Sequence, residues 1–403
     1  ILKKGNILNY AKFRASLANT ARLNDPYSNQ SFFVNNFSSS ILPINYTYNF
    51  TVANPLLEPE KQQTYEIGTE LRFLNGAISL EAAYYNTLCT NQIAQGYRAS
   101  YATGGVLNTK NAASLRNEGI ELTLGLTPIN RQNLNWTVNF NFNHVWSKVL
   151  TLPSSIGEFN DFYNSDTYIS NVRGGLIRGQ STGTLTGSIY SRNNAGQILI
   201  SPTTGLPIVT GGNSLIADRT PDFTLGTLNT IRYKNWSLSF LWDLKVGGDI
   251  YNGTDQLLTV LGKSGRTGDR HISRVIEGVL SDGLQNTANP TKNTLAIVPQ
   301  YLSTYYTTMP DEEFIQKDVN WFRLRDVTLN FMLPAKTLKH LRVVKGLSVF
   351  VTGNDLLLFT NYYGADPAVN ANNPGTGGVG GYGMDLGSTS TPLSLSFGLR
   401  ANF

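Results

Sequence analysis

The sequence is poor in the residues that most catalytic and metal sites use. Its 403 residues include one cysteine, Cys89, and three histidines, His144, His271 and His340. A single cysteine excludes an internal disulfide, and the histidines show no metal-ligand spacing. Cys89 follows an alternating segment, so we interpret it as a small structural residue rather than a nucleophile. We therefore predict no catalytic residue, no metal ligand and no cofactor site, and the substrate-binding residues remain unknown at this stage.

Charge and long apolar runs are also scarce. Charged residues make up 15% of the chain, which is low for a soluble protein of this size. No run approaches the roughly 20 apolar residues of a transmembrane helix. The net charge of +5 is spread along the chain without a basic tract. These absences exclude a helical membrane protein and give no indication of nucleic-acid binding.

The C-terminal segment carries the clearest pattern that is present. From Leu393 to Phe403, apolar residues occupy every odd position and polar or small residues every even one. Strict alternation predicts a strand with one apolar and one polar face. About ten such residues cross a membrane as a tilted β-strand. The same segment fits the last strand of a soluble sandwich, and by itself it does not separate these two alternatives.

Alternation recurs along the chain and predicts an all-β protein. Apolar residues alternate with polar ones most clearly in 134–146 and 235–250. The predicted strands, twelve in number, are 9–22, 63–74, 76–89, 117–127, 134–146, 168–179, 184–191, 221–233, 235–250, 321–332, 346–358 and 392–403.

The connections between these strands alternate in length. The short ones are Leu74–Gly76, Pro128–Asn133, Ser181–Gly183, Lys234–Asn235 and Pro334–Lys345. The long ones are 23–62, 90–116, 147–167, 192–220, 251–320 and 359–391. Short periplasmic turns and long extracellular loops are typical of an outer-membrane barrel, whereas sandwich loops do not alternate in this way. The loops therefore favour a transmembrane antiparallel β-barrel.

Two loop patterns invite other interpretations. Gly375, Gly377 and Gly380 match G-x-G-x-x-G, but no strand precedes them and no helical period follows, so we interpret them as an external loop. Within 251–320, apolar residues at helical spacing predict an amphipathic helix over Ile272–Leu280. It would pack over the barrel mouth, against a partner or within its own loop, and these alternatives stay open.

Tyrosines gather near the predicted loops and strand ends. They are Tyr301, Tyr305, Tyr306, Tyr362, Tyr363 and Tyr382. Aromatic faces stack on sugars and fill peptide pockets, but they also form interfacial girdles. For each tyrosine taken singly, we favour the girdle or packing role over ligand contact.

Six segments carry motifs that occur in one order. They are Asn54–Gly68 (NPLLEPEKQQTYEIG), Asn111–Leu124 (NAASLRNEGIELTL), Asp222–Asn252, Trp321–Pro334 (WFRLRDVTLNFMLP), Gly353–Pro367 and Thr391–Phe403. Together they resemble the C-terminal half of the SusC/RagA family of TonB-dependent outer-membrane transporters. Asp355, where the family usually has an amide, and residues 23–50 depart from the pattern.

The resemblance implies a barrel of about 22 strands with a plugged lumen. Residues 1–403, with about twelve strands, would then be the C-terminal portion of the barrel domain, without the plug and the N-terminal strands. The chain begins at Ile1, close to an alternating segment, which agrees with this expectation. Two open sheet edges would have to be completed by residues outside the chain.

The resemblance also implies a function. It indicates energy-dependent import of an oligomeric nutrient, a glycan or a peptide, across the outer membrane of a Gram-negative bacterium, and no enzymatic activity. The implied partners are a SusD-like surface lipoprotein that acts as a lid, the TonB complex through the missing N-terminal regions, the substrate, and outer-membrane lipid. No cofactor is implied. A passive porin and an autotransporter or adhesin barrel are the alternatives, and the run of motifs argues against both.

Overall fold

The computed structural model describes most of the chain from residue 7 to residue 403. The residues outside the description are 1–6, 25, 27–28, 36–45, 49–50, 99–106, 153–162, 167–171, 302–303, 339–342 and 370–380.

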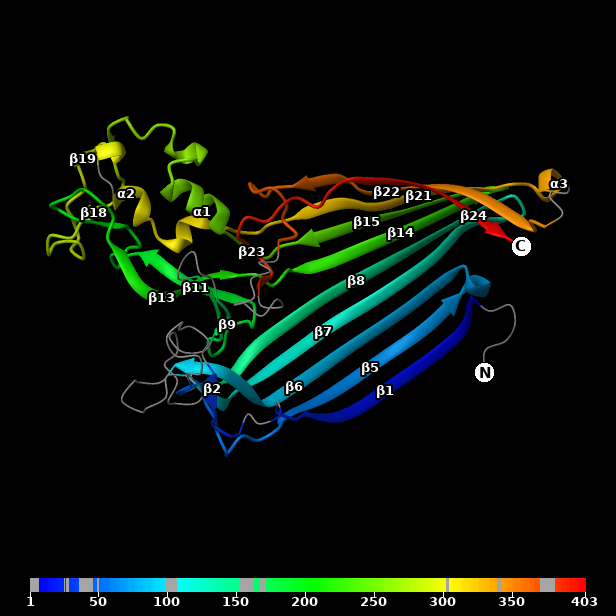
Figure 1. Cartoon of the computed structure of the whole chain (residues 1–403), viewed down its shortest axis with the longest axis horizontal. Helices are drawn as coiled ribbons and strands as arrows, with labels where there is room; N and C mark the ends of the chain where they lie inside the picture. The colour runs from blue at the N-terminus through cyan, green and yellow to red at the C-terminus, as the bar shows by residue number, and fades with distance from the viewer. Residues whose placement is uncertain are drawn as a thin grey trace.

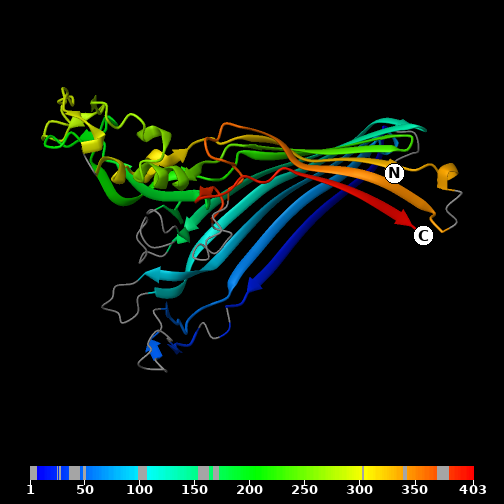
Figure 2. The ribbon, with the colours of Figure 1, turned by 45° about the horizontal axis from the view of Figure 1, so that its top comes forward.

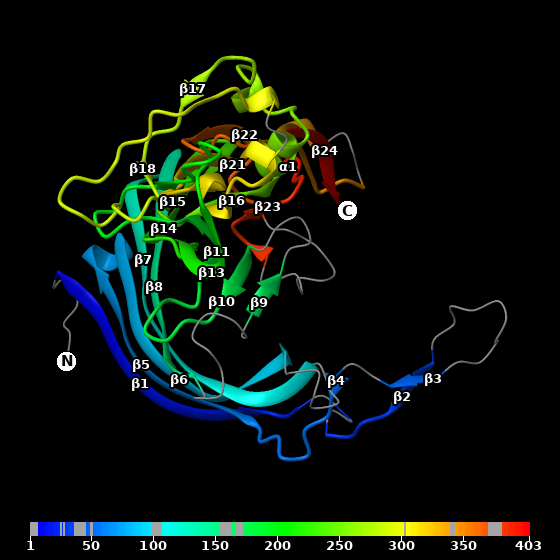
Figure 3. The same cartoon turned by 90° about the vertical axis from the view of Figure 1, so that its left-hand side faces the viewer.

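One large antiparallel sheet forms the main part of the molecule (Figure 1). Its strands follow in chain order as β1 (Leu8–Arg22), β5 (Glu60–Phe73), β6 (Ile78–Arg98), β7 (Leu107–Arg131), β8 (Leu134–Thr151), β14 (Phe223–Tyr233), β15 (Trp236–Val246), β21 (Trp321–Met332), β22 (Gly346–Thr360) and β24 (Ser394–Asn402). The short β4 (Thr51–Val52) adds to β7 in parallel. Viewed from its end, the sheet curves like part of a barrel wall (Figure 3).

The outer face of this sheet is apolar and the inner face polar, as the alternation predicts. Cross-strand aromatic contacts cover the outer face, with ring centroids 4.3 Å apart for Trp242–Phe322 and 4.5 Å for Trp236–Phe331. On the inner face, Arg14 pairs with Glu66 at 3.2 Å between neighbouring strands. The large exposed apolar surface is what a lipid-facing wall requires.

The two ends of the sheet differ in the length of the connections between strands. Short turns at one end join β5 to β6 through η1 (Leu74–Gly76), and β14 to β15 through Lys234 and Asn235. Lys234 takes the left-handed φ of 51° that this tight turn needs. The connection at 334–345 includes α3 (Ala335–Leu338) and lies at the same end (Figure 1). The long connections between wall strands lie at the opposite end, as predicted, although β6 and β7 extend far into the predicted loop 90–116 and the predicted connections 181–183 and 192–220 do not join wall strands.

The predicted strand 184–191 is present as β11 (Thr184–Tyr190), but its assignment to the barrel wall, like that of the described part of 168–179, is wrong. β11 forms a separate small sheet on the concave side with β9 (Tyr163–Asp166), β10 (Arg173–Gly175) and β13 (Val209–Asp218) (Figure 3). Residues 168–171 lie outside the description. Successive residues Thr184–Gly187 are all buried, so protein covers both faces of β11 and no face is left for lipid. Consequently 181–183 is not a periplasmic turn, and ten long strands form the wall.

The predicted helix over 272–280 is also wrong. β17 (Arg274–Val275) pairs with β19 (Ala296–Ile297), and β18 (Val279–Leu280) pairs in parallel with β12 (Leu199–Ile200). A nine-residue helix is marginal by itself, and backbone pairing with two neighbouring segments replaces it here. Val279 is fully buried, whereas Val275 is 48% exposed, so no continuous apolar stripe forms.

The remaining elements are short. They are β2 (Phe33–Asn35), β3 (Tyr46–Tyr48), β16 (Ile250–Asn252), α1 (Gly253–Val260), η3 (Gly265–Thr267), η4 (Pro299–Tyr301), α2 (Thr304–Thr307), η5 (Asp311–Phe314), β20 (Ile315–Gln316) and β23 (Met384–Asp385). Among the described residues, no helix has the length and apolar character needed to cross a bilayer.

Three long connections fold together into one unit. We call the described residues of 163–220, 247–320 and 361–391 the loop body, and Figure 2 shows it at one end of the sheet. All three connections contribute to one buried core, which consists of Val172, Leu185, Ile216, Ala217, Tyr251, Phe314 and Met384. A shared core makes the loop body a folded structure rather than a set of separate loops.

Candidate functional site

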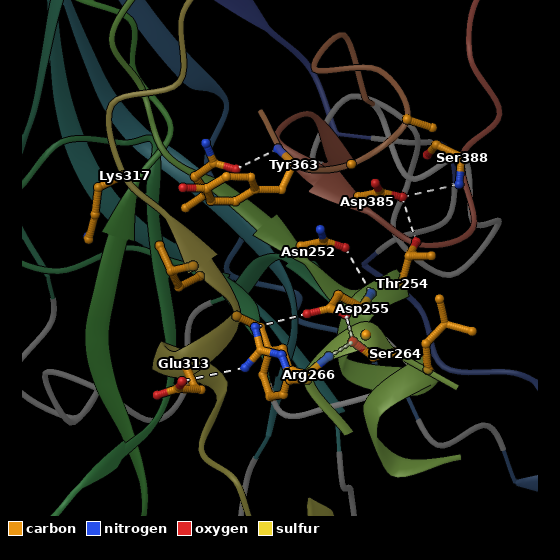
Figure 4. A pocket seen from close by; sticks show the side chains of 17 residues that line it. Asn252, Thr254, Asp255, Ser264, Arg266, Glu313, Lys317, Tyr363, Asp385 and Ser388 are labelled. Carbon is orange, nitrogen blue, oxygen red and sulfur yellow. Dashed lines mark hydrogen bonds and ion pairs between the residues drawn. The ribbon is translucent and has the colours of Figure 1, made fainter. Parts of the chain in front are cut away.

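The loop body contains a cavity of about 670 Å³, shown in Figure 4. Its side chains come from α1, η3, η5, β20 and the segments around β23. We call it the α1 pocket. It is lined by Asn252, Thr254, Asp255, Leu258, Ser264, Gly265, Arg266, Glu313, Phe314, Ile315, Gln316, Lys317, Tyr363, Gly364, Ala365, Asp385 and Ser388.

A small sheet brings the distant parts of this pocket together. The central strand β16 pairs antiparallel with β20 and parallel with β23. In this register Tyr251 lies opposite Ile315 and Met384, and Asn252 lies opposite Asp385. Residues more than one hundred positions apart in sequence thus become neighbours at the start of α1.

The start of α1 is fixed by side-chain hydrogen bonds. Asn252 is the N-cap, and its side chain accepts a hydrogen bond of 2.9 Å from the Asp255 N–H. The Thr254 hydroxyl donates to Asp385 Oδ1 at 2.6 Å. Asp255 lies in the first helical turn, where the helix dipole stabilises a negative charge. The local sequence therefore holds Asp255 and Asp385 on the same wall of the pocket.

Arg266 links two carboxylates across the pocket. Its guanidinium lies 2.9 Å from Asp255 Oδ2 and 3.4 Å from Glu313 Oε1. It also lies over the Phe314 ring at 4.7 Å from the centroid, a cation–π distance. Ser264 adds a 2.5 Å hydrogen bond to Asp255 Oδ1. These contacts hold the guanidinium in one orientation, with a third of the side chain still open to solvent.

The wall that carries Asp255 also includes a buried carboxylate. Asp385 is 2% exposed and accepts hydrogen bonds from the Tyr362 hydroxyl at 2.8 Å and from the Ser388 N–H at 3.2 Å. Burial raises the pKa of Tyr362, and the neighbouring Asp385 charge raises it further. Tyr362 therefore stays protonated and donates its hydrogen bond throughout the physiological pH range.

The next residue, Tyr363, points the other way. It is 91% exposed, while its backbone N–H is held by Gln316 Oε1 at 2.9 Å. An ordered backbone with a free ring suits stacking against a ligand at low entropic cost. The pocket thus offers an aromatic face beside fixed donors and acceptors, an arrangement for binding a polar ligand.

A charged network anchors this wall of the pocket to the barrel. Arg323, 2% exposed at the loop-side end of β21, pairs with Asp366 and lies 3.2 Å from Asp355 Oδ1. Arg325 pairs with Asp243 at 2.8 Å and with Asp355 at 3.4 Å. Asp355, with a φ of 50°, lies in a bulge between β21 and β22, where it and Leu356 stand opposite Arg325.

Asp366 is the point at which the network reaches the loop. Burial raises its pKa, but hydrogen bonds from Arg323 and from the N–H groups of Ala368 and Thr391 outweigh burial, so the pKa lies below its ordinary value. Asp366 therefore remains ionised and ties the connection between β22 and β24 to β21.

The structure separates the tyrosines that the sequence grouped. Tyr363 alone among them lines the α1 pocket, and Tyr362 supports it. Tyr305 and Tyr306 pack edge to face at 4.8 Å in α2, and Tyr382 lies 4.4 Å from the Arg219 guanidinium. For these residues packing is the observed role.

The histidines and the glycine motif that the sequence analysis singled out do not form a catalytic site among the described residues. His144 lies in β8 against Trp146, and His271 lies apart in the loop body. His340 and Gly375–Gly380 lie outside the described residues. Within the described part of the chain, no group of histidine, cysteine and acidic residues could hold a metal ion.

Sequence reasoning missed the charged residues of the pocket. Asp255, Arg266, Glu313 and Asp385 lie in segments without periodicity. The Asn252 cap followed by Asp255 was the available signal, since it marks a helix start. Nothing in the sequence indicates that Asp385 lies close to this helix start.

Comparisons with known proteins agree with this architecture. Residues 6–257 match the family model described as TonB dependent receptor-like, beta-barrel. The TonB-dependent receptor P3 of Formosa agariphila is 25% identical over the whole chain, which covers 40% of that protein. The TonB-dependent receptor SusC of Bacteroides thetaiotaomicron is 21% identical, again over the whole chain and 38% of the relative. The chain thus spans about two fifths of the length of these curated relatives.

Solved structures show the same fold. The RagAB peptide importer in its closed-closed state matches with a TM-score of 0.70 and 17% identity, over 99% of this chain and 42% of that chain. In its open-open state the TM-score is 0.65, with the same identity and coverage of 99% and 41%.

Proposed function

The chain belongs to the TonB dependent receptor-like β-barrel family, and on this basis we propose that it forms part of an outer-membrane importer of oligomeric nutrients in a Gram-negative bacterium. The predicted resemblance to the SusC/RagA family is confirmed by the SusC relative and the RagAB fold. We propose a glycan or a peptide as the substrate class.

Residues 1–403 would supply the C-terminal portion of the barrel. β1 and β24 each have one neighbour in the large sheet, and an unpaired strand edge is costly in lipid. Strands outside this chain would close the wall, and an N-terminal plug would fill the lumen and pass energy from TonB. The family and the share of the relatives covered support this division.

The α1 pocket is the proposed contact site for the substrate. It lies at the long-loop end, and the observation that carries the proposal is the free Tyr363 ring beside the fixed Arg266 and Asp255. Nothing in this arrangement performs a reaction, so the protein is proposed as a transporter and not as an enzyme.

A SusD-like surface lipoprotein would act as the lid over this end. The C-terminal part of α1 presents apolar side chains that no described residue covers fully: Leu257, Leu258, Val260 and Leu261 are 39% to 61% exposed. An apolar cluster on an extracellular face is typical of a partner surface. It supports docking of the lipoprotein beside the α1 pocket.

Energy dependence separates this proposal from a passive porin. Uptake of a labelled oligosaccharide or oligopeptide pool by cells producing the full-length transporter should stop when TonB is deleted or the proton-motive force is collapsed. Uptake that continues unchanged under both conditions would favour a passive channel.

Removal of the free aromatic ring should weaken uptake. Tyr363→Ala should reduce uptake at low substrate concentration about 2- to 10-fold, because an aromatic contact contributes about 0.5–1.5 kcal/mol. Tyr301→Ala is the matched control, since Tyr301 is 78% exposed but lies outside the pocket. Equal uptake by both variants would remove the α1 pocket from the proposed function.

Labelling of intact cells tests the orientation. In a Cys89→Ser background, Gly265→Cys should react with a membrane-impermeant maleimide, because a side chain at Gly265 would meet nothing within 4 Å. Asn235→Cys, in the two-residue turn at the other end, should react only after the cells are opened. The reverse result would invert the assigned topology.

A further inference from the structure

Two cations face each other across β7 and β8. Arg116 and Lys148 are direct partners in the antiparallel register, and both side chains remain substantially exposed. Side chains opposite each other in such a pair begin about 5 Å apart, and like charges in that position are destabilising. Either the fold tolerates this repulsion or an anion offsets it.

The pair lies on the outer face of the wall. The alternate residues Leu115 and Val149 pack with Leu176, from the segment that follows β10 on the concave side. Because successive strand residues point to opposite faces, Arg116 and Lys148 point outward. No lumen ligand can reach them from the inside.

The pair also lies just beyond the apolar band. Ile120, Leu122, Leu124 and Leu126 follow one another on the outer face of β7, and Arg116 is four residues further toward the long-loop end. About ten tilted residues cross the hydrocarbon core, so Arg116 stands at the level of the outer lipid headgroups.

The neighbouring residues do not neutralise the positive charge of Arg116 and Lys148. Glu118 lies 3.8 Å from the Arg116 guanidinium, but it also accepts hydrogen bonds from Asn86 at 2.8 Å and Tyr84 at 3.4 Å. No ion pair to Lys148 is found in the described part of the chain. Arg116 thus has one carboxylate partner that is already engaged, and Lys148 has no ion-pair partner among the described residues.

We propose that Arg116 and Lys148 bind a phosphate group of an anionic glycolipid in the outer leaflet. The inference rests on the proposed function, because it needs the wall to stand in an outer membrane. A guanidinium and an ammonium on side chains whose Cβ atoms lie about 5 Å apart can both donate charge-assisted hydrogen bonds to one phosphate. The bound phosphate would offset the repulsion and fix the barrel at its depth in the membrane.

Lipid binding to the purified full-length transporter tests the proposal. In detergent, Arg116→Gln/Lys148→Gln should bind lipid A bearing its phosphates about 30-fold more weakly than the unsubstituted protein, because each cation near an anionic lipid surface contributes about 1 kcal/mol. Arg116→Lys/Lys148→Arg, which keeps both charges, should retain most of the affinity. Lys234→Gln, at the opposite end of the wall, is the control and should bind as the unsubstituted protein does.

Three results would overturn the proposal: equal binding by the Gln pair, equal binding of dephosphorylated lipid A, or displacement of the lipid by inorganic phosphate at the lipid's own concentration. The last would indicate a site for free phosphate. Heat-resistant migration on gels shows whether each variant has folded. Membrane fractionation of the unsubstituted protein reports on the proposed function separately, because binding in detergent does not depend on where the cell places the protein.

Discussion

Arg323→Ala is expected to destabilise the barrel by about 3–5 kcal/mol, because it leaves the buried Asp366 carboxylate without its cation. Asp366 is 4% exposed, and Asp355 would keep only its longer contact to Arg325. The connection between β22 and β24 would lose its anchor on β21, and the Tyr363 side of the α1 pocket would lose its support. Urea unfolding of the full-length protein in lipid vesicles measures the change.

Arg14→Ala is the matched control. Its pair with Glu66 also joins neighbouring strands, but both side chains are well exposed, so its loss should cost about 1 kcal/mol or less. Arg323→Ala/Asp366→Asn should recover part of the lost stability, since it removes one stranded charge. Equal small effects of Arg323→Ala and Arg14→Ala would contradict the role assigned to the network.

The network also gives the stability a pH dependence with a definite sign. The folded-state pKa of Asp366 lies below its ordinary value of about 4. Its contribution is therefore complete above that ordinary value and is lost as the pH falls through the folded-state pKa. In Arg323→Ala this loss on acidification should be smaller.

Phe140→Arg is the second substitution with a large expected effect. Phe140 lies on the outer face of β8, opposite Leu124 of β7 and Thr227 of β14. An arginine near the bilayer midplane costs about 2–4 kcal/mol on the lipid face and much less in the lumen. The variant should give less heat-resistant barrel in outer-membrane fractions.

Asn141→Arg is the control, one residue further along the same strand and on the inner face. Asn141 is exposed, and among the described side chains only the Thr123 hydroxyl donates a hydrogen bond to its Oδ1. It should assemble as the unsubstituted protein does. Equal assembly of both variants would show that the strand phase is wrong.

The wall of the barrel could be predicted from the sequence because two solvents enforce its alternation. In β8 and β15, every second residue meets lipid and the others meet the lumen, so the period is visible without knowing any partner. The strand β11 lacks such a period because protein covers both of its faces. Its assignment to the wall failed for that reason.

The charged network could be predicted only in pieces. Arg323 and Arg325 belong to the motif Trp321–Pro334, whereas Asp355 and Asp366 belong to the motif Gly353–Pro367. The sequence shows the two motifs separately and does not link them. Their meeting depends on the β21–β22 register and its bulge, which no local pattern specifies. The α1 pocket is even harder to predict from the sequence, because the β16–β23 pairing joins Asn252 to Asp385 across 133 positions.

The shared core of the loop body limits how this surface can be exchanged during evolution or in the laboratory. Transplanting only 251–320 from a relative would carry Tyr251 and Phe314 but leave behind Leu185, Ile216 and Met384, against which they pack. Such a chimera would join two half-cores of different ancestry. The loop body should therefore be inherited as a block of three coupled connections, and a graft that keeps its core intact would have to move all three at once.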